Sequence, residues 1–137
     1  MNRNLGSIQP QLNVQSLASG VYHYHLKTHS LELIPFEEIR NQSMKQIRQQ
    51  WIGDAGFLIV PTAVFERTEA KYKDRGYRHI MTEYGHIAQN VYLVGAALDL
   101  GVCSVGGFID DGLNRILDID GRVESVIGLI AIGNKKQ

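Results

Sequence analysis

The residue types that could carry out chemistry are few, and most of them lie between positions 83 and 107. Glu83 and His86 stand three residues apart, so on a helix they could act as an acid/base pair or simply satisfy each other. The single cysteine, Cys103, is either a nucleophile or a small core residue. Gly106 and Gly107 come next, and two adjacent residues without side chains let a backbone approach a flat ligand closely.

Metal and covalent chemistry have weaker support in the sequence. His23 and His25 would share one face of a strand, but no cysteine or carboxylate lies nearby at ligand spacing, so we expect them to face solvent. The acidic run Asp118–Gly121 lacks the spacing of an EF-hand loop and predicts a turn. A nucleophile elbow, a Walker loop and a strong metal signature are all absent from the sequence, so it predicts no metal site and singles out no catalytic side chain.

The element expected to position the glycine pair is a helix that begins near Arg78. Its apolar residues recur at helical spacing and cover all sides, which predicts a helix buried in the domain or in a dimer interface. Gly101 is expected to end this helix, because a left-handed last residue favours glycine. The residues from Val102 to Phe108 are then expected to form a short apolar turn.

The remaining pattern predicts one α+β domain that spans residues 1–137, without repeats or linkers. In the first half of the chain we expect an irregular segment at 1–19, a β-hairpin at 21–34 and an amphipathic helix at 36–51, whose start Pro35 suits. A strand is expected at 57–64, with Pro61 at an edge or an irregularity, and a solvated connection or short helix follows at 65–77. After the glycine pair we expect a short helix that is capped by Asp110 or Asp111 and runs to Leu117, and then a strand at 126–132 covered on both faces.

Composition excludes several classes of partner. The 14 basic and 14 acidic residues give a formal net charge of zero, which argues against nucleic acid or an anionic membrane as the main partner. One cysteine excludes an internal disulfide and fits a reducing cytoplasm. No apolar run reaches the roughly 20 residues of a membrane span, and a signal-peptide core is absent. We therefore expect a soluble cytoplasmic protein.

An ordered series of residues also carries a family resemblance. It consists of Lys71-Tyr72, Asp74-Arg75-Gly76-Tyr77-Arg78, Glu83, Gly85-His86, Gln89-Asn90, Gly101 and Val105-Gly106-Gly107-Phe108. This series resembles the second half of a nitroreductase-fold flavoprotein, most closely the SagB-type dehydrogenases that oxidise azoline rings in peptide natural products. Looser similarity extends from Gly20 to Gly133, so the resemblance covers roughly the C-terminal two thirds of such a domain.

The resemblance implies an FMN-dependent oxidoreductase in which hydride passes through flavin N5, with NAD(P)H as a possible electron donor. It implies that the backbone amides of Val105, Gly106 and Gly107, with Ser104 just before them, reach the N5 and O4 edge of the ring. Amides that donate there would stabilise negative charge on the reduced ring. Lys135 or Lys136 could hold the flavin phosphate, or could belong to a solvated tail.

The sequence departs from the family at its beginning. An Arg-Arg-Ser type segment that grips the flavin phosphate has no counterpart, and Gly6–Pro10 is at best a remnant of the following loop. We therefore expect a truncated nitroreductase-like fold that works as a homodimer; the other arrangement is a second chain that supplies the N-terminal part. The alternatives are a flavin-free binding or scaffolding subunit that dimerises through the helix from Arg78 to Leu100, and a nonfunctional remnant.

Overall fold

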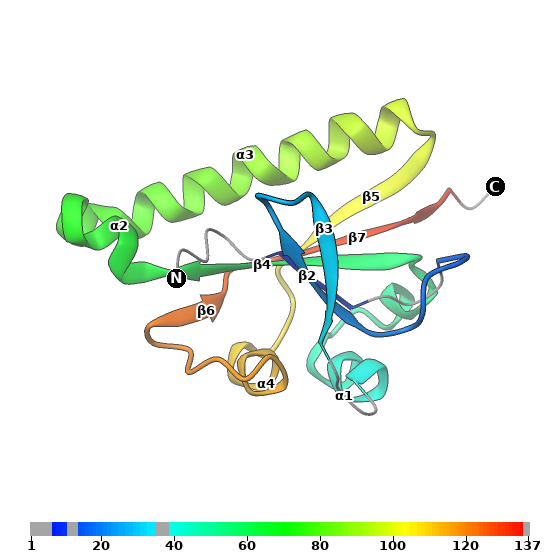
Figure 1. The fold of residues 1–137 in the computed structure, drawn as a ribbon, viewed down its shortest axis with the longest axis horizontal. Helices are drawn as coiled ribbons and strands as arrows, with labels where there is room; N and C mark the ends of the chain where they lie inside the picture. Colours follow the sequence, from blue (N-terminus) through cyan, green and yellow to red (C-terminus); the bar gives the residue numbers. More distant parts are fainter. Residues whose placement is uncertain (1–6, 11–13, 35–38, 136–137) are drawn as a thin grey trace.

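The computed structural model describes residues 7–10, 14–34 and 39–135, and it arranges them around one antiparallel sheet (Figure 1). The main path of the sheet has the order β3-β2-β1-β4-β7-β5, and β6 pairs with β4 off this path. The strands are β1 (Ser7–Pro10), β2 (Val21–His25), β3 (Ser30–Ile34), β4 (Phe57–Val64), β5 (Leu100–Val105), β6 (Glu124–Val126) and β7 (Leu129–Asn134). The expected mixture of helices with a mostly antiparallel sheet is therefore confirmed.

Helices cover both faces of the sheet (Figure 1). The long helix α3 (Gly76–Ala97) lies along one face, and α1 (Ile39–Gln46) and α4 (Asp110–Ile116) lie on the other. The two faces of β4 and β7 accordingly belong to two apolar clusters, one containing Ala88 of α3 and one containing Leu113 of α4. Two turns of 3-10 helix, Gln50–Asp54 and Lys73–Arg75, and the short helix α2 (Phe65–Tyr72) complete the described elements.

Several expected elements are confirmed where the sequence pattern is strongest. The hairpin at 21–34 forms from β2 and β3, with Tyr22 opposite Leu33. Strand β4 has the expected bounds, and Pro61 lies where β4 changes partner from β7 to β6, so it marks an irregularity and not an edge. The strand expected at 126–132 is confirmed only in part: Val126 belongs to β6, and β7 begins at Leu129 and runs to Asn134. Strand β7 is covered on both faces, with Leu129 and Ile130 fully buried.

The N-terminal segment is more regular than expected. Within the range 1–19, Ser7–Pro10 forms strand β1 and pairs with both β2 and β4, so the expectation of an irregular segment is wrong for these residues. These four residues lack the alternation of apolar and polar residues that predicts a strand. They form one because their backbone pairs with β2 on one side and with β4 on the other. The expected loop remnant at Gly6 and the expected helix start at Pro35 and Phe36 lie outside the described residues.

Two other helices differ from expectation at one end, and a third segment takes one of its two expected forms. Helix α1 ends at Gln46, because the chain then forms a bridge from Ile47 to Phe108. The segment after β4 is helical, as one of the two alternatives expected. Asp110 and Asp111 lie in the first turn of α4 and do not cap it, since the N-cap position is Ile109 and carries no side-chain hydrogen bond.

The region after α3 requires a larger correction. Helix α3 ends at Ala97, and Asp99, with φ of 57°, takes the left-handed conformation that we expected at Gly101. Leu100–Val105 is strand β5 and not a turn, with every residue from Leu100 to Val105 paired to β7. The ladder satisfies backbone groups that an apolar turn would leave unpaired.

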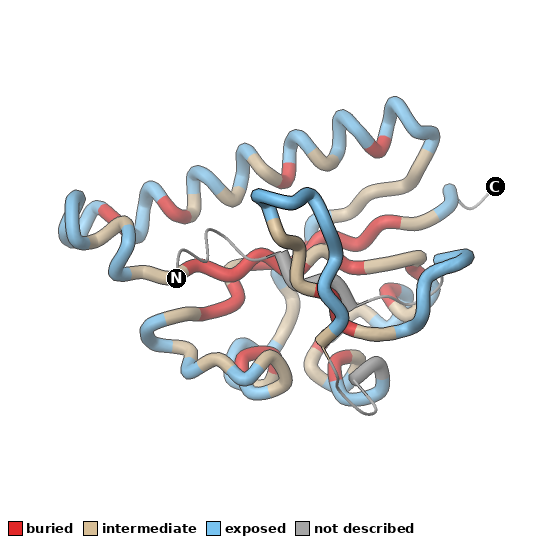
Figure 2. Tube along the Cα trace, in the orientation of Figure 1, coloured by how far each residue is buried: buried red, intermediate tan, exposed pale blue. Residues whose placement is uncertain are grey.

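Helix α3 is buried on one side only within the single chain. Ile80, Ala88 and Gly95 face the sheet and are buried, whereas Leu93, Val94 and Leu98 are 60%, 57% and 63% exposed. Figure 2 shows α3 as a mostly exposed helix with a few buried positions spaced along it. The expected all-round burial is therefore wrong for the isolated chain. Within the described ranges, no helix is both long and apolar enough to cross a membrane.

Candidate functional site

The turn that contains Gly106 and Gly107 is held by the end of helix α1. The Arg48 N–H donates to the Gly107 carbonyl at 2.9 Å, and the Ile109 N–H donates to the Gln46 carbonyl at 2.8 Å. On the other side of the turn, Val105 is 4% exposed and packs into the apolar core. Two layers of the fold therefore fix a turn whose own residues have no side chains.

The two glycines have different surroundings. A Cβ on Gly106 would meet no atom within 4 Å, so this residue faces open space. A Cβ on Gly107 would lie 2.5 Å from Nε2 and 2.8 Å from Oε1 of Gln49. Gln49 thus packs directly against Gly107, and its buried Oε1 has no hydrogen-bond partner. The turn is therefore closed toward α1 and open on the side of Gly106.

The backbone donors of this turn are available to a ligand. In the described part of the chain, neither the Gly106 N–H nor the Gly107 N–H donates to another group. Unpaired donors at an exposed turn are satisfied by solvent or by a bound acceptor. The geometry can therefore supply two hydrogen bonds to the edge of a flat molecule that approaches Gly106.

Ser104 is tied to helix α3 through two tyrosines. Its Oγ lies 2.7 Å from the Tyr84 hydroxyl, and its backbone N–H donates to the Tyr92 hydroxyl at 2.7 Å. The Tyr84 hydroxyl also donates to the Leu129 carbonyl at 3.3 Å. The amide of Ser104 is therefore occupied, and only its exposed side-chain oxygen can take part in binding.

Lys135 does not lie with the other predicted site residues. In the β5–β7 ladder Leu100 pairs with Asn134 and Val105 with Leu129, so Lys135 lies beyond one end of the ladder and Gly106 beyond the other. The Lys135 amine binds Asp99 Oδ1 at 2.5 Å, and this ion pair lowers the pKa of the Asp99 carboxyl. Lys136 falls outside the described residues.

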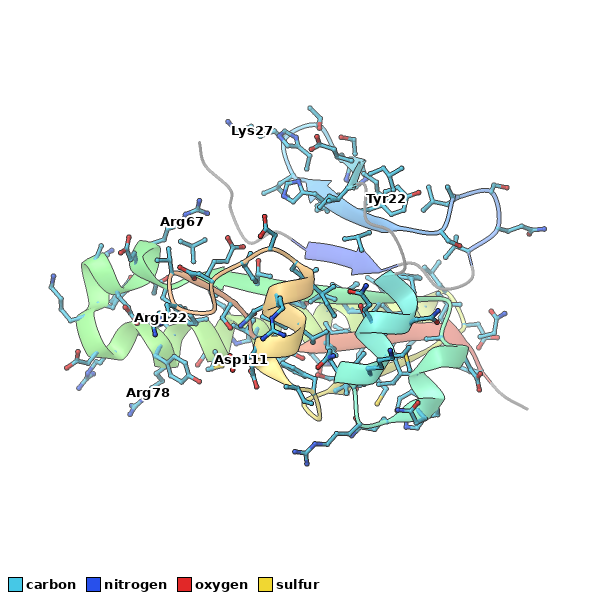
Figure 3. The ribbon with its side chains drawn as sticks, turned by 90° about the horizontal axis from the view of Figure 1, so that it is seen from below. Tyr22, Lys27, Arg67, Arg78, Asp111 and Arg122 are labelled. Atoms are coloured by element: carbon cyan, nitrogen blue, oxygen red, sulfur yellow. The ribbon has the colours of Figure 1, made fainter. Side chains whose placement is uncertain are left out.

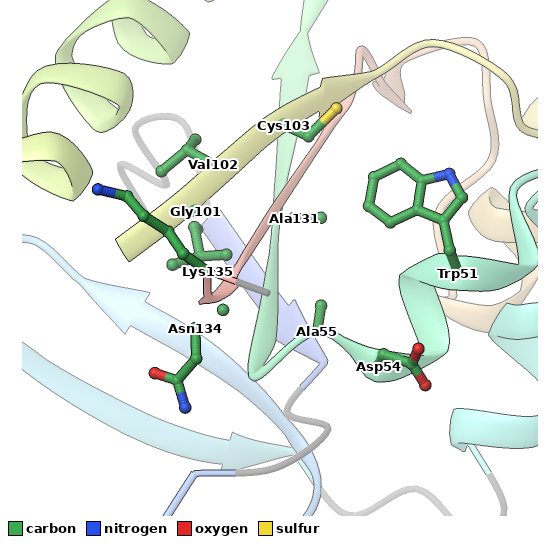
Figure 4. Close-up of a pocket in the computed structure, with 11 residues that line it drawn as sticks. Trp51, Asp54, Ala55, Gly101, Val102, Cys103, Ala131, Asn134 and Lys135 are labelled. Carbon is green, nitrogen blue, oxygen red and sulfur yellow. The ribbon is translucent and has the colours of Figure 1, made fainter. Parts of the chain in front are cut away.

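A pocket of about 380 Å³ lies beside Lys135, on the sheet face opposite α3 (Figure 4). Its floor consists of small residues on β5 and β7, among them Gly101, Cys103 and Ala131, and Trp51 stands at its side. Cys103 is a free, half-buried thiol on this floor. Among the described residues no group of three or more His, Cys, Asp or Glu side chains could hold a metal ion.

The other candidates from the sequence do not gather at the turn. Glu83 and His86 are both exposed on α3, and no hydrogen bond between their side chains is present. His25 accepts or donates a 2.7 Å hydrogen bond with Thr28 inside the hairpin. Figure 3 shows charged side chains such as Lys27, Arg67 and Arg78 on separate parts of the outer surface. In the described part of the chain, none of these candidate side chains forms a hydrogen bond with the glycine turn.

The acidic loop has the structural role that its sequence predicted. Asp120 Oδ1 accepts hydrogen bonds from the N–H groups of Arg122, Val123 and Glu124 at 2.8, 2.8 and 3.2 Å. These backbone donors lower the pKa of the Asp120 carboxyl, because they stabilise its charged form. The loop is a turn organised by one carboxylate.

Comparison with known proteins decides the family. The model of the nitroreductase family matches residues 9–134, which is nearly the whole chain. The chain belongs to the nitroreductase family. The resemblance noted in the sequence is thus confirmed, and the exposed glycine turn lies within the matched region.

Two relatives show the range of this similarity. A protein of Methanocaldococcus jannaschii named as a nitroreductase, MJ1384, is 37% identical over 90% of this chain and 61% of its own length. The microcin B17-processing protein McbC of Escherichia coli is 27% identical over 80% of this chain and 42% of its own length. The chain therefore spans less than two thirds of the length of the relatives it matches.

Solved structures agree with this assignment. A nitroreductase structure from Anabaena variabilis superposes with a TM-score of 0.86 at 32% identity, over 98% of this chain and 28% of that chain. A nitroreductase from Desulfovibrio desulfuricans in complex with FMN has a TM-score of 0.58 at 23% identity, over 74% of this chain and 57% of that chain. The second likeness supports the fold alone.

Sequence reasoning missed the residues that surround the turn. Gln49, which precedes the 3-10 helix at Gln50–Asp54, packs against Gly107, and Tyr84 and Tyr92 of α3 bind Ser104 just before the turn. In the sequence, Tyr84 is simply one of the apolar residues that recur at helical spacing along this helix. A phenol within such a stripe was the available signal, because a buried tyrosine hydroxyl usually finds a polar partner.

Proposed function

We propose that this chain is a subunit of an FMN-dependent oxidoreductase, and that the Gly106–Gly107 turn holds the edge of the flavin ring. The observation that carries the proposal is the open Gly106 backbone with two N–H donors that have no partner in the described part of the chain. Membership of the nitroreductase family supports the choice of flavin.

The residues of the turn fit an isoalloxazine edge. The N5 and O4 atoms of that edge accept hydrogen bonds, and the two glycine N–H groups donate them. A side chain at Gly106 would stand between the backbone and the ring, since the space beyond this residue is empty. When bound, the flavin would supply hydride transfer, with NAD(P)H or the substrate as the other reactant.

The chain itself would position the ring and tune its charge. The bond from the Arg48 N–H to the Gly107 carbonyl and the burial of Val105 fix the turn before any ligand arrives. Preorganised donors stabilise negative charge without a reorganisation cost. This arrangement fits a site in which, among the described residues, no acidic or basic side chain forms a hydrogen bond with the turn.

The phosphate end would depend on groups away from the turn. The Lys135 amine is engaged by Asp99, at the opposite end of the β5–β7 ladder from Gly106. We propose that a second copy or another chain contributes the phosphate contacts. The exposed apolar residues on α3, together with a neighbouring apolar pocket of about 330 Å³ lined by Ile87, Val91 and Val94, favour a homodimer.

A flavin-free binding subunit remains the second candidate. The engagement of Lys135 by Asp99 and of the Ser104 amide by Tyr92 favours it, because both groups were expected at the cofactor. In that case α3 would act only as an interface.

The substitution Gly106→Ala separates these functions. We expect it to leave the fold intact, because a Cβ there meets nothing within 4 Å. The wild-type protein should retain FMN through gel filtration and show visible flavin absorbance, whereas the variant should lose most of it. Equal retention by both proteins would contradict the proposed site, and a colourless wild-type protein would favour the flavin-free subunit.

A further inference from the structure

Tyr84 links three parts of the structure at one hydroxyl group. The residue belongs to α3, its hydroxyl lies 2.7 Å from Ser104 Oγ on β5, and it donates to the Leu129 carbonyl on β7 at 3.3 Å. Ser104 lies two residues before Gly106. The tyrosine thus contacts the strand that leads directly into the glycine turn.

The hydrogen bonds of Tyr84 determine the role of Ser104. Either hydroxyl could donate in the 2.7 Å contact between Tyr84 and Ser104, but the Leu129 carbonyl only accepts, so its 3.3 Å contact requires the single phenol proton of Tyr84. The 2.7 Å contact between Tyr84 and Ser104 then needs the proton of the serine hydroxyl. Because Ser104 is exposed and its own proton is engaged, it can offer a ligand only the lone pairs of its oxygen.

The fold makes specific room for this arrangement. A Cβ on Gly128 would collide with the ring and hydroxyl of Tyr84, so the tyrosine reaches Ser104 and Leu129 across a residue that has no side chain. Gly128 is itself buried, in the connection between β6 and β7. The position of the Tyr84 hydroxyl is therefore fixed by packing as well as by hydrogen bonds.

We infer that Tyr84 is a positioning residue for the ligand at the glycine turn: it holds Ser104 as a hydrogen-bond acceptor next to the donors of Gly106 and Gly107. This inference rests on the proposed function. A site with two donors and one acceptor selects a ligand edge with two acceptors and one N–H donor. The pyrimidine side of an isoalloxazine ring has this pattern in N5, O4 and N3–H.

The test compares lumiflavin with 3-methyllumiflavin, which lacks the N3–H donor. We expect wild-type protein to bind lumiflavin about two- to twelve-fold tighter, the range that corresponds to one net hydrogen bond. Tyr84→Phe and Ser104→Ala should each reduce this ratio toward one. Tyr77→Phe is the matched control, because Tyr77 is an exposed tyrosine of the same helix that stacks on Phe65.

Gly128→Ala tests the packing without removing either hydroxyl. It should displace the Tyr84 ring and lower the ratio as Tyr84→Phe does. An unchanged ratio in Tyr84→Phe, with both flavins still bound, would overturn the inference. Tyr84→Phe is the decisive variant, because it keeps the ring and its packing and should fold. The affinity ratio of the two flavins can be measured only in a folded variant.

Hydrogen exchange on the ligand-free protein separates this inference from the proposed function. Loss of the Tyr84 hydroxyl should speed amide exchange at Ser104 and Val105 at least several-fold, with no change in Tyr77→Phe. Unchanged exchange in Tyr84→Phe would overturn the positioning role. A wild-type protein that binds neither flavin would contradict the proposed function, and the exchange result would then decide the positioning role alone.

Discussion

Gly106 and Gly107 are neighbours with different structural constraints. Gly107 packs against the Gln49 amide, with Nε2 only 2.5 Å from the position that a Cβ would take, whereas Gly106 faces open space. The absence of a side chain thus serves internal packing at one residue and access at the other. Substitutions at the two positions should therefore have different effects on stability.

We predict that Gly107→Ala lowers the free energy of unfolding by about 1–3 kcal/mol, because overpacking against Gln49 forces the turn or the side chain to move. Gly106→Ala should leave it unchanged or raise it by up to about 1 kcal/mol, through a less flexible unfolded chain. Urea unfolding of both variants measures this difference. Equal stability of the two variants would mean that the Gln49 contact does not constrain the turn.

Asp120 gives a pH-dependent contribution to stability. Three backbone N–H groups lower the pKa of its carboxyl in the folded protein, so the carboxylate stabilises the fold above the ordinary aspartate pKa. This contribution is lost as the pH falls through the lowered value. The stability difference between wild type and Asp120→Asn should therefore be full at neutral pH and shrink in acid, below about pH 4.

Thermal unfolding across this pH range provides the measurement. Asp118→Asn is a matched control, since Asp118 is an exposed carboxylate in the same loop. A wild-type advantage over Asp120→Asn that stays constant down to strong acid would show that the three N–H contacts do not stabilise the charged form.

At the level of single residues, the sequence predicted the glycine pair but not its neighbours. The absence of side chains at Gly106 and Gly107 is visible in the sequence itself. The contacts of Gln49 and Tyr84 arise only when α1 and α3 pack on opposite faces of the sheet. Pairings of this kind depend on tertiary structure, so residue spacing could not predict them.

The elements that alternate clearly were predictable. The hairpin of β2 and β3 and the bounds of β4 follow from alternating or continuous apolar residues of strand length. Strand β5 was missed because its apolar run directly follows an apolar helix, and Gly101 suggested a helix end. Strand β1 was missed because its four residues pair on both sides without an apolar pattern.

Helix α3 carries the clearest prediction at the level of elements. Leu98 is 63% exposed near its end, beside Leu93 and Val94 on the uncovered side of the helix. If this side forms the proposed dimer interface, Leu98→Glu should place a charge in an apolar contact and shift the protein to monomer. Sedimentation velocity measures the mass of each variant.

Leu26→Glu is the matched control for that experiment. Leu26 is 62% exposed, but it lies in the β2–β3 hairpin and away from α3. This variant should keep the mass of the wild-type protein. Dissociation of both variants, or of neither, would remove the support for an interface on α3.

At the scale of the whole molecule, the nitroreductase fold of this chain has two surface regions where apolar residues are exposed or line an open pocket. One is the exposed apolar side of α3, and the other is the pocket beside Trp51 and Cys103 on the opposite face. The chain spans 61% of the length of MJ1384, which is 37% identical to it. In the proposed oxidoreductase, a second chain would cover the exposed apolar side of α3.

The most direct test of this account is sedimentation velocity with added FMN, followed at both the protein band and the visible flavin band. We predict that flavin co-sediments with a species of twice the 15.4 kDa chain mass. Gly106→Ala should keep that mass without carrying flavin. If the flavin absorbance does not move with the boundary of the wild-type protein, the central claim is contradicted, whatever the mass of the protein.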